Sequence, residues 1–264
     1  MTAPRIMAVV NVTPDSFSDG GQFNSSQGAV DHALRCIDAG AHMLDIGGES
    51  TRPGATGVDA EEERRRVIPV IEGIRRHNEA IPISIDTMKA DVAEAAIRVG
   101  ANVINDVSAG RHDARMLDAA ASLGVPLILM HMQGQPRTMQ DAPHYDDVVA
   151  DVYHFLRERV HAARAAGVPS VLVDVGIGFG KTLDHNVALL RNLSRFNDLA
   201  DGQVLGISRK RFLGALTGID RAADRDEATM LAHAMLLPHN VAWIRVHDVA
   251  RAALLSRLTL LRSE

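Results

Sequence analysis

Polar side chains able to bind a ligand or carry charge follow eight short apolar runs of this chain. The cations among them suit phosphate oxygens, because a guanidinium can contact two oxygens at once. This cationic set comprises Arg52, Lys210, Arg245 and His247. Acids and amides suit the donor-rich edge of an amino-heterocycle. This second set comprises Asp86, Asn105 and Asp174. One polar strand end can simply meet solvent, but the coincidence at all eight favours a shared site for a ligand with a polyanionic end and an amino-heterocycle end.

The segments that must position these side chains alternate between short apolar runs and longer amphipathic stretches. The runs are strand-sized and rich in Val, Ile and Leu, as is typical of strands covered on both faces. They are Ile6–Val10, Met43–Ile46, Ile81–Ile85, Ala101–Ile104, Pro126–Met130, Ser170–Val173, Gln203–Ile207 and Ala242–Val246. Helix-sized stretches between them include Ala29–Ala39, Ala60–Arg76, Lys89–Val99, Tyr145–Ala166 and Thr229–Leu237. We expect glycine C-caps near the ends of four helices, at Gly40, Gly100, Gly124 and Gly167.

Eight β-then-α units in 264 residues predict an α/β fold, a single (β/α)8 TIM barrel that forms one domain over residues 1–264. A doubly wound open sheet is the competing interpretation. A barrel brings the carboxyl ends of its strands to one mouth, where the two polar sets would meet. The loops after the first and second strands are the longest, at Thr13–Gln27 and Gly47–Asp59. Both are rich in Gly, Ser, Thr, Asp and Pro, so we expect them to be mobile lids.

The composition excludes several classes of partner. The net charge is −5, from 28 basic and 33 acidic residues, and no long block of like charge occurs. We therefore expect no binding to nucleic acid or to a membrane surface. The single cysteine, Cys36, excludes an intramolecular disulfide and a cysteine-only zinc site. Because a signal-peptide pattern and an apolar run of about 18 residues are both lacking, we expect a soluble, cytoplasmic protein.

Two features imitate other kinds of site. The segment Gly176–Thr182 resembles a nucleotide-binding loop, but it is one residue too short for the Walker A pattern, and Val175 stands where that pattern needs Gly. We therefore reject nucleotide binding there. His131 ends the fifth apolar run and could be a ligand, although a hydrogen-bonded strand-end histidine is the favoured interpretation.

Long motifs of this chain resemble those of the dihydropteroate synthases, a family of pterin-binding TIM barrels. NVTPDSFSDGG at residues 11–21 resembles the family's opening signature, and DIGGESTRPG at residues 45–54 resembles its second. Further matches follow in the family's order at residues 84–87, 104–107, 130–134, 178–181, 208–210 and 245–249. The resemblance covers the chain from about Ile6 to its C-terminus.

The resemblance implies a transferase of folate biosynthesis. The family condenses 6-hydroxymethyl-7,8-dihydropterin diphosphate with p-aminobenzoate and releases pyrophosphate, in a dissociative, SN1-like displacement. By this similarity the pterin would be held by Asp86, Asn105, Asp174 and Lys210. The diphosphate would be held by Asn11, Arg52, Arg245 and His247, with Mg²⁺ reached through Asn11. The p-aminobenzoate pocket would be formed by Phe17, Thr51, Pro53 and Phe179, with Arg211 near the carboxylate.

The resemblance also implies catalytic roles and an assembly. Asp19, on the first lid, would stabilise the cationic pterin left when the diphosphate departs. The catalytic residues would then be Asp19, Asp86, Asp174 and Lys210. Members of the family are commonly homodimers, and sulfonamides mimic p-aminobenzoate, so we expect a homodimer and a sulfonamide target.

Three positions depart from the usual pattern of the family. Val175 stands where the family has Pro, and we expect a looser turn that aims Asp174 less rigidly. Arg211 stands where Ser often contacts the p-aminobenzoate carboxylate, so we expect a helix N-terminus to meet that group. Asn240 stands where the family has Gly, and because Asn tolerates the left-handed conformation we expect little effect.

Two alternatives remain open at this point. A methyltetrahydrofolate:corrinoid methyltransferase would keep the acid and amide set but would have no use for Arg52, Arg245 and His247. A non-catalytic pterin-binding paralogue would be expected to lose a lid or a strand-end residue, and this chain loses none.

Overall fold

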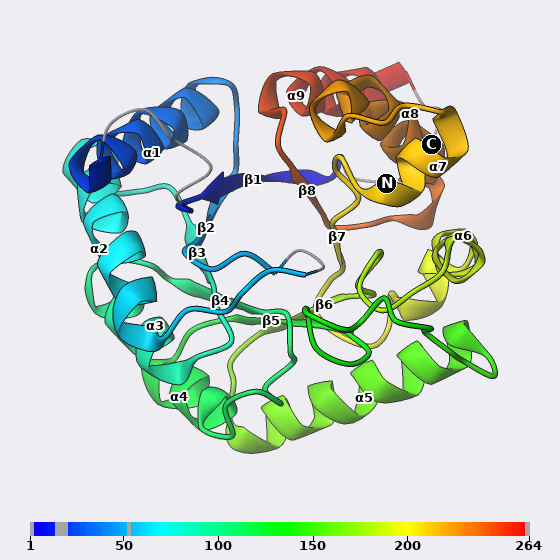
Figure 1. Ribbon diagram of the computed structural model, residues 1–264, viewed down its shortest axis with the longest axis horizontal. Coiled ribbons are helices and arrows are strands. Elements are labelled where there is room, and N and C mark those ends of the chain that lie inside the picture. The colour runs from blue at the N-terminus through cyan, green and yellow to red at the C-terminus, as the bar shows by residue number, and fades with distance from the viewer. Residues whose placement is uncertain (1–2, 14–20, 52–53, 262–264) are drawn as a thin grey trace.

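Eight parallel strands curl into a barrel, and helices surround it (Figure 1). The computed structural model describes residues 3–13, 21–51 and 54–261. The strands are β1 (Arg5–Asn11), β2 (Met43–Gly47), β3 (Ile83–Asp86), β4 (Val103–Asp106), β5 (Leu127–Met130), β6 (Val171–Asp174), β7 (Val204–Leu205) and β8 (Trp243–Val246). They are hydrogen-bonded in the order β6-β5-β4-β3-β2-β1-β8-β7. A bridge between Val173 and Gln203 joins β6 to the segment leading into β7, which excludes the open sheet.

The helices follow the strands in the order that a TIM barrel requires. They are α1 (Gly21–Asp38), α2 (Ala60–His77), α3 (Ala90–Arg98), α4 (Met116–Leu123), α5 (Val148–Ala166), α6 (Leu183–Arg191), α7 (Arg211–Thr217), α8 (Asp226–Leu236) and α9 (Val249–Leu258). Short 3-10 turns add η2 (Leu193–Phe196), η3 (Ala222–Arg225), η4 (Leu237–His239) and η5 (Thr259–Leu261). Among the described residues, no helix combines the length and the apolar character that crossing a membrane requires.

Glycines end helices where the sequence predicts them. Gly40, Gly100, Gly124 and Gly167 all have φ between 65° and 116°. In this left-handed region a residue without a Cβ is least strained, so each helix can stop and turn into the next strand. The predicted C-caps are confirmed.

Most predicted boundaries lie within about three residues of the observed ones, and two of the differences affect the loops at the barrel mouth. Helix α1 begins at Gly21, so the first loop is shorter than the predicted Thr13–Gln27. The first turns of α1 contain Gly, Asn and Ser, which have low helix propensity, and local preference therefore hides the true start. Strand β7 spans only Val204–Leu205, because Gly206 and the residues after it leave the sheet to form the barrel mouth. The second loop ends as predicted, at Asp59, whose side chain accepts a hydrogen bond from the Glu62 N–H and caps α2.

The barrel interior consists of two layers, because side chains two residues apart on a strand share a face. The layer nearer the strands' amino ends is apolar and comprises Met7, Met43, Val103, Ile128, Val204 and Trp243. Residues from strands on opposite sides of the ring pack together in this layer, which therefore lies inside the barrel. Two residues further along three of these strands stand Asp45, Asn105 and Arg245. An apolar floor thus carries a polar layer above it.

The turn after β6 provides a test of the fold. Gly176 has φ +69°, and a Cβ there would lie 1.8 Å from the His131 carbonyl oxygen. We expect Gly176→Ala to lower the free energy of unfolding by about 4 kcal/mol, because strained backbone and a clash with backbone combine. Gly124→Ala is the matched control, since Gly124 has φ +65° but no atom within 4 Å of its Cβ. Strain alone should cost about 1–2 kcal/mol there. Urea denaturation measures both, and equal losses would contradict the close approach.

Candidate active site

Four strands contribute to one buried network at the barrel mouth. Arg245 on β8 donates from Nε to Asp45 Oδ2 at 2.6 Å and from Nη2 to Asp86 Oδ2 at 2.9 Å. Asp45, on β2, also accepts from Ser84 Oγ at 2.6 Å and from Asn105 Nδ2 at 3.2 Å. Two carboxylates therefore share one guanidinium, which is the arrangement that lets buried charges persist in a protein interior.

Asp86 keeps one oxygen for a ligand. Its Oδ1 is buried and has no hydrogen-bond partner among the residues that the structure describes. Burial and, second, the Asp45 carboxylate raise the pKa of Asp86 to about 8, against the opposing effect of Arg245. A buried acceptor without a donor is unfavourable unless a ligand supplies one. The ionised form of Asp86 therefore suits a bound N–H group, which would supply the missing donor.

Asp174 and Lys210 converge on the opposite side of the mouth. Asp174 accepts from the Gly176 N–H at 2.7 Å, and Lys210 donates to the Ile177 carbonyl oxygen at 2.5 Å. A Cβ on Gly206 would lie 3.4 Å from Asp174 Oδ2 and 3.8 Å from Lys210 Nζ, so both groups lie over this glycine. Burial raises the pKa of Asp174, which Lys210 opposes, and burial lowers the pKa of Lys210 to about 8, which Asp174 opposes.

The turn that carries Asp174 is held although Val175 replaces the expected proline. Val175 is 1% exposed and packs in the main core cluster. The Gly176 N–H donates a hydrogen bond to the Asp174 carboxylate, and the backbone of Gly176 packs closely against the His131 carbonyl group. This geometry gives Asp174 a defined orientation without a proline ring.

His247 presents a defined face to the mouth. Its backbone N–H donates to Ser208 Oγ at 3.2 Å, and its Nδ1 lies 2.9 Å from the same oxygen. Because Ser208 Oγ already accepts one hydrogen bond, its hydroxyl proton can go to Nδ1, and the neutral ring then carries its own proton on Nε2. That tautomer is a donor suited to an anion.

The remaining predicted residues occupy three kinds of place. Asn11 ends β1 and is half-buried, as is Thr51 on the second loop. Arg211 is exposed and begins α7, with Lys210 as its N-cap. Four predicted residues lie outside the described part of the chain, namely Phe17, Asp19, Arg52 and Pro53.

Phe179 supplies an apolar wall beside this polar layer. It packs against a buried cluster made of Met88, Val107, Met130, Met132 and Met139. Lys210 Nζ lies 4.7 Å from the centre of the Phe179 ring, within the range of a cation–π contact. An aromatic ring of a ligand could therefore pack against Phe179, beside the acidic side chains of the mouth.

Sequence reasoning overlooked Asp45 as a site residue. Asp45 is fully buried beneath the mouth and accepts hydrogen bonds from Ser84, Asn105 and Arg245. One signal could have found it: Asp45 stands two residues after Met43 of the apolar floor, as Asn105 stands after Val103. His131, by contrast, is a structural residue as favoured, because its Nδ1 pairs with the buried Lys181 Nζ at 2.9 Å.

No group of three or more His, Cys, Asp or Glu side chains converges as a metal site within residues 3–13, 21–51 and 54–261. The amide oxygen of Asn11, at the end of β1, is a hard ligand of the kind that Mg²⁺ binds.

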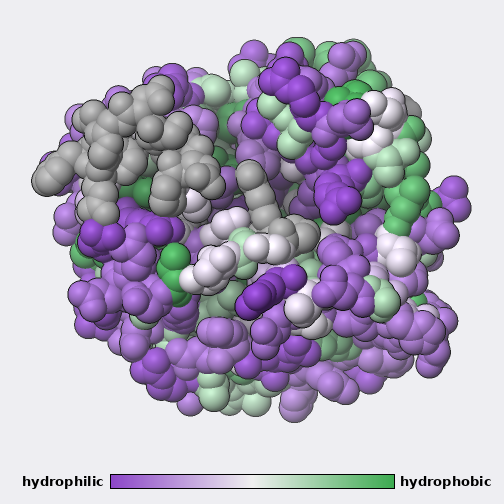
Figure 2. Space-filling model, viewed as in Figure 1, coloured by the Kyte–Doolittle hydropathy of each residue, from purple (hydrophilic) through white to green (hydrophobic). Residues whose placement is uncertain are grey.

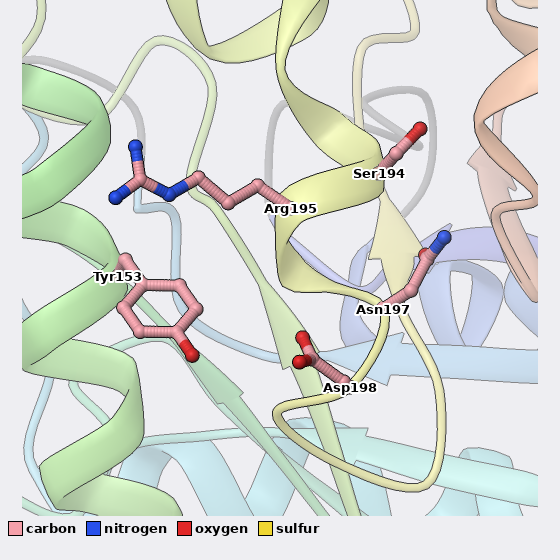
Figure 3. Close-up of a pocket in the computed structure, with 5 residues that line it drawn as sticks. All are labelled: Tyr153, Ser194, Arg195, Asn197 and Asp198. Carbon is pink, nitrogen blue, oxygen red and sulfur yellow. The ribbon is translucent and has the colours of Figure 1, made fainter.

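A separate hollow of about 400 Å³ lies outside the barrel between α5 and η2 (Figure 3). It is lined by Tyr153, Ser194, Arg195, Asn197 and Asp198. The Arg195 guanidinium lies 5.6 Å from the Tyr153 ring centre and so already has a partner. None of the predicted site residues lines this hollow, and we place the chemistry at the barrel mouth.

A barrel with acids, amides and cations gathered at its mouth defines the class of a pterin-binding barrel enzyme, and comparison with known proteins agrees. A family model described as "Pterin binding enzyme" matches residues 7–247. The dihydropteroate synthase of Escherichia coli (strain K12) is 44% identical over 251 residues, which cover 94% of this chain and 88% of that protein.

Solved structures give the same result. This chain superposes on the Xanthomonas albilineans dihydropteroate synthase with 4-aminobenzoic acid with a TM-score of 0.92, at 48% identity over 99% of this chain and 94% of that one. The complex of the Xanthomonas albilineans enzyme with 7,8-dihydropteroate gives a TM-score of 0.88 at 45% identity, over 98% and 93%. The chain therefore belongs to the pterin-binding enzymes and, within them, to the dihydropteroate synthase family.

The raised pKa of Asp86 predicts how stability depends on pH. The folded-state pKa of about 8 lies above the ordinary carboxyl value of 3.8, so the folded state binds more protons between these limits. The stability contribution of Asp86 is therefore lost as pH rises from about 4 to 8. We expect the unfolding free energy of Asp86→Asn, relative to the wild type, to increase steadily from pH 5 to pH 8 in urea denaturation.

Asp201→Asn is the control for this experiment. A hydrogen bond from the Val171 N–H lowers the pKa of Asp201, so its contribution is constant above pH 5 and is lost only in acid. A difference between wild type and Asp86→Asn that does not change with pH would contradict the raised pKa.

Proposed function

We propose that this chain condenses 6-hydroxymethyl-7,8-dihydropterin diphosphate with p-aminobenzoate to give 7,8-dihydropteroate and pyrophosphate. The observation that carries the proposal is the barrel mouth, where Asp86 and Asp174 lie within reach of Arg245 and Lys210 and beside Phe179. The acids of this site suit an amino-heterocycle, the cations suit a diphosphate, and Phe179 suits an aromatic ring.

The chain's own residues would work by binding and by charge. Asp86, Asn105, Asp174 and Lys210 hold the pterin, whose N–H groups meet acceptors such as Asp86 Oδ1. When the C–O bond breaks, its electron pair leaves with the diphosphate, and the positive charge left on the pterin is stabilised by buried carboxylates. Asp174 is in place for this role, and Asp19 of the first loop would add a second carboxylate.

The leaving group would be held by cations and a metal-binding amide. Arg52, Arg245 and His247 hold the diphosphate, and the Nε2–H tautomer of His247 is suited to an oxygen anion. Asn11 would hold Mg²⁺ together with diphosphate oxygens, and a bound Mg²⁺ supplies further neutralisation of the departing charge.

The amine nucleophile would enter from the apolar side of the mouth. Phe179 and Thr51, with Phe17 and Pro53, would line the p-aminobenzoate pocket, and the carboxylate of that substrate would meet the start of α7, where Arg211 stands. The aniline nitrogen attacks the pterin methylene carbon as the neutral amine, and the ammonium that forms then loses a proton to water, so the attack itself needs no general base. Sulfonamides share this shape and would compete for the same pocket.

Pyrophosphate release tests the proposal. We expect release that requires both p-aminobenzoate and Mg²⁺ and that falls at least about 100-fold in Asp174→Asn, because one stabilising charge is lost from the transition state. Asp198→Asn, in the hollow outside the barrel, is the control and should match the wild type. Inhibition by a sulfonamide should be competitive with p-aminobenzoate. Tight pterin binding without release would instead support a non-catalytic paralogue.

We also infer that the protein is a cytoplasmic homodimer. Helices α8 and α9 pack side by side and expose large apolar side chains (Figures 1 and 2). Leu231 and Met235 are 62% and 79% exposed, one turn apart on α8, and Leu254 and Leu258 repeat this spacing on α9. Exposed apolar side chains on two neighbouring helices favour an interface, and the family's homodimers suggest a second copy as its partner. The unpaired thiol of the buried Cys36 is compatible with a reducing compartment.

A charge placed in this face tests the assembly. We expect Met235→Glu to convert a dimer into a monomer of 28.4 kDa in sedimentation velocity, because the interface would have to bury an unpaired carboxylate. Leu183→Glu, on α6 and 37% exposed, is the matched control and should leave the dimer intact. A wild-type protein that sediments as a monomer, or a Met235→Glu variant that remains dimeric, would contradict this interface.

A further inference from the structure

Asp45 lies beneath the mouth rather than in it. Its side chain is fully buried, whereas Arg245 and Asp86 retain 23% and 11% exposure. Asp45 accepts from Ser84 Oγ, Asn105 Nδ2 and Arg245 Nε, so donors from three strands surround its carboxylate. A ligand at the mouth would meet the partners of Asp45 and not Asp45 itself.

Asp45 determines the plane of the Arg245 guanidinium. An arginine side chain has many rotamers, but hydrogen bonds from Nε to Asp45 and from Nη2 to Asp86 define the plane of its head group. With Asp45 removed, Asp86 alone would hold the guanidinium by one edge. The remaining N–H groups of Arg245 would then lose their fixed direction.

Asp45 also determines which end of the Asn105 amide faces the ligand. A carboxylate can only accept hydrogen bonds, so the Asn105 group that faces it must be the donor Nδ2. The Asn105 Oδ1 atom is therefore turned away from Asp45 as an acceptor. A neutral amide at position 45 could either donate or accept, so it would permit both orientations of the Asn105 amide. Asn105 would then no longer present only its oxygen, and the site would no longer favour a hydrogen-bond donor on the ligand.

We propose that Asp45 is the positioning residue of the pterin site: without touching the ligand, it holds Arg245 toward Asp86 and turns the Asn105 amide oxygen toward the bound heterocycle. This role rests on the proposed function, because it assumes a pterin at the mouth. A buried counter-ion of purely structural importance would affect folding and would not select among substrates.

Binding and kinetics of Asp45→Asn distinguish these roles. We expect this nearly isosteric variant to bind 6-hydroxymethyl-7,8-dihydropterin diphosphate about 10-fold or more weakly by calorimetry, since two contact groups lose their orientation. The KM for p-aminobenzoate should stay within about 2-fold, because the hydrogen bonds to Asp45 come from Ser84, Asn105 and Arg245 and not from the side of the mouth that carries Phe179. A loss shared equally by both substrates would contradict the proposal.

Ser84→Ala is the matched control. Ser84 is buried and donates to Asp45, so its loss weakens the same cluster without freeing Arg245 or Asn105. This variant should lose stability yet bind the pterin diphosphate within about 3-fold of the wild type, because Arg245 and Asn105 still donate to the Asp45 carboxylate and keep their orientation. If pterin affinity instead follows the urea midpoint across Ser84→Ala and Asp45→Asn, the role of Asp45 is structural and the proposal is wrong.

A double-mutant cycle tests whether Asp45 acts through Arg245. In an Arg245→Gln background, Asp45→Asn should weaken pterin binding by a smaller factor than it does in the wild type, because one of the two groups that it orients is gone and only Asn105 remains. Equal factors in both backgrounds would contradict the proposal. If Asp45→Asn does not fold, the smaller Asp45→Ser replaces it with the same expectations. A wild-type protein that neither binds the pterin diphosphate nor releases pyrophosphate would overturn the proposed function instead.

Discussion

One arginine shared by two buried carboxylates is the interaction on which the site depends. Arg245 reaches across the barrel from β8 to Asp45 on β2 and Asp86 on β3. Without it, two acids in a closed barrel would face each other in a medium that stabilises charge poorly. Removing one partner of such a network typically costs about 3–5 kcal/mol, because the other charge is left buried and uncompensated. The contact of Arg245 with Asp45 and Asp86 also places a positive charge beside the two acids and fixes the direction of the arginine N–H groups.

The barrel creates this network by stacking layers. The apolar floor of residues such as Met43 and Val103 closes the interior to water, and the next inward position on three of the strands carries a polar side chain, at Asp45, Asn105 and Arg245. Water exclusion strengthens every electrostatic contact above the floor and explains why burial shifts the pKa of Asp86 and of Lys210 in opposite directions. The pKa values of Asp86 and Lys210 are both about 8 as a result.

Glycines make the pocket possible where side chains would fill it. Gly206 lies beneath Asp174 and Lys210, and its lack of a Cβ leaves these two groups room to converge. Gly176 allows the turn after β6 to touch the backbone at His131, which brings Asp174 into the mouth although Val175 stands in place of proline. Close approach of backbone, rather than any single strong bond, thus sets the shape of this side of the site.

Local signals in the sequence determined the eight strands, the glycine C-caps and the strand-end residues, because apolar periodicity and turn chemistry act over a few residues. The pairing of those residues was decided by the tertiary structure. Asp45 and Arg245 are 200 positions apart, and only closure of the barrel brings them to 2.6 Å. The early start of α1 and the short β7 also differ from the local pattern, because the first turns of α1 have weak helix propensity and the apolar run of β7 continues beyond the strand. Sequence specified which chemistry was available, and folding decided which groups touch, because contact between distant strands is a property of the closed ring alone.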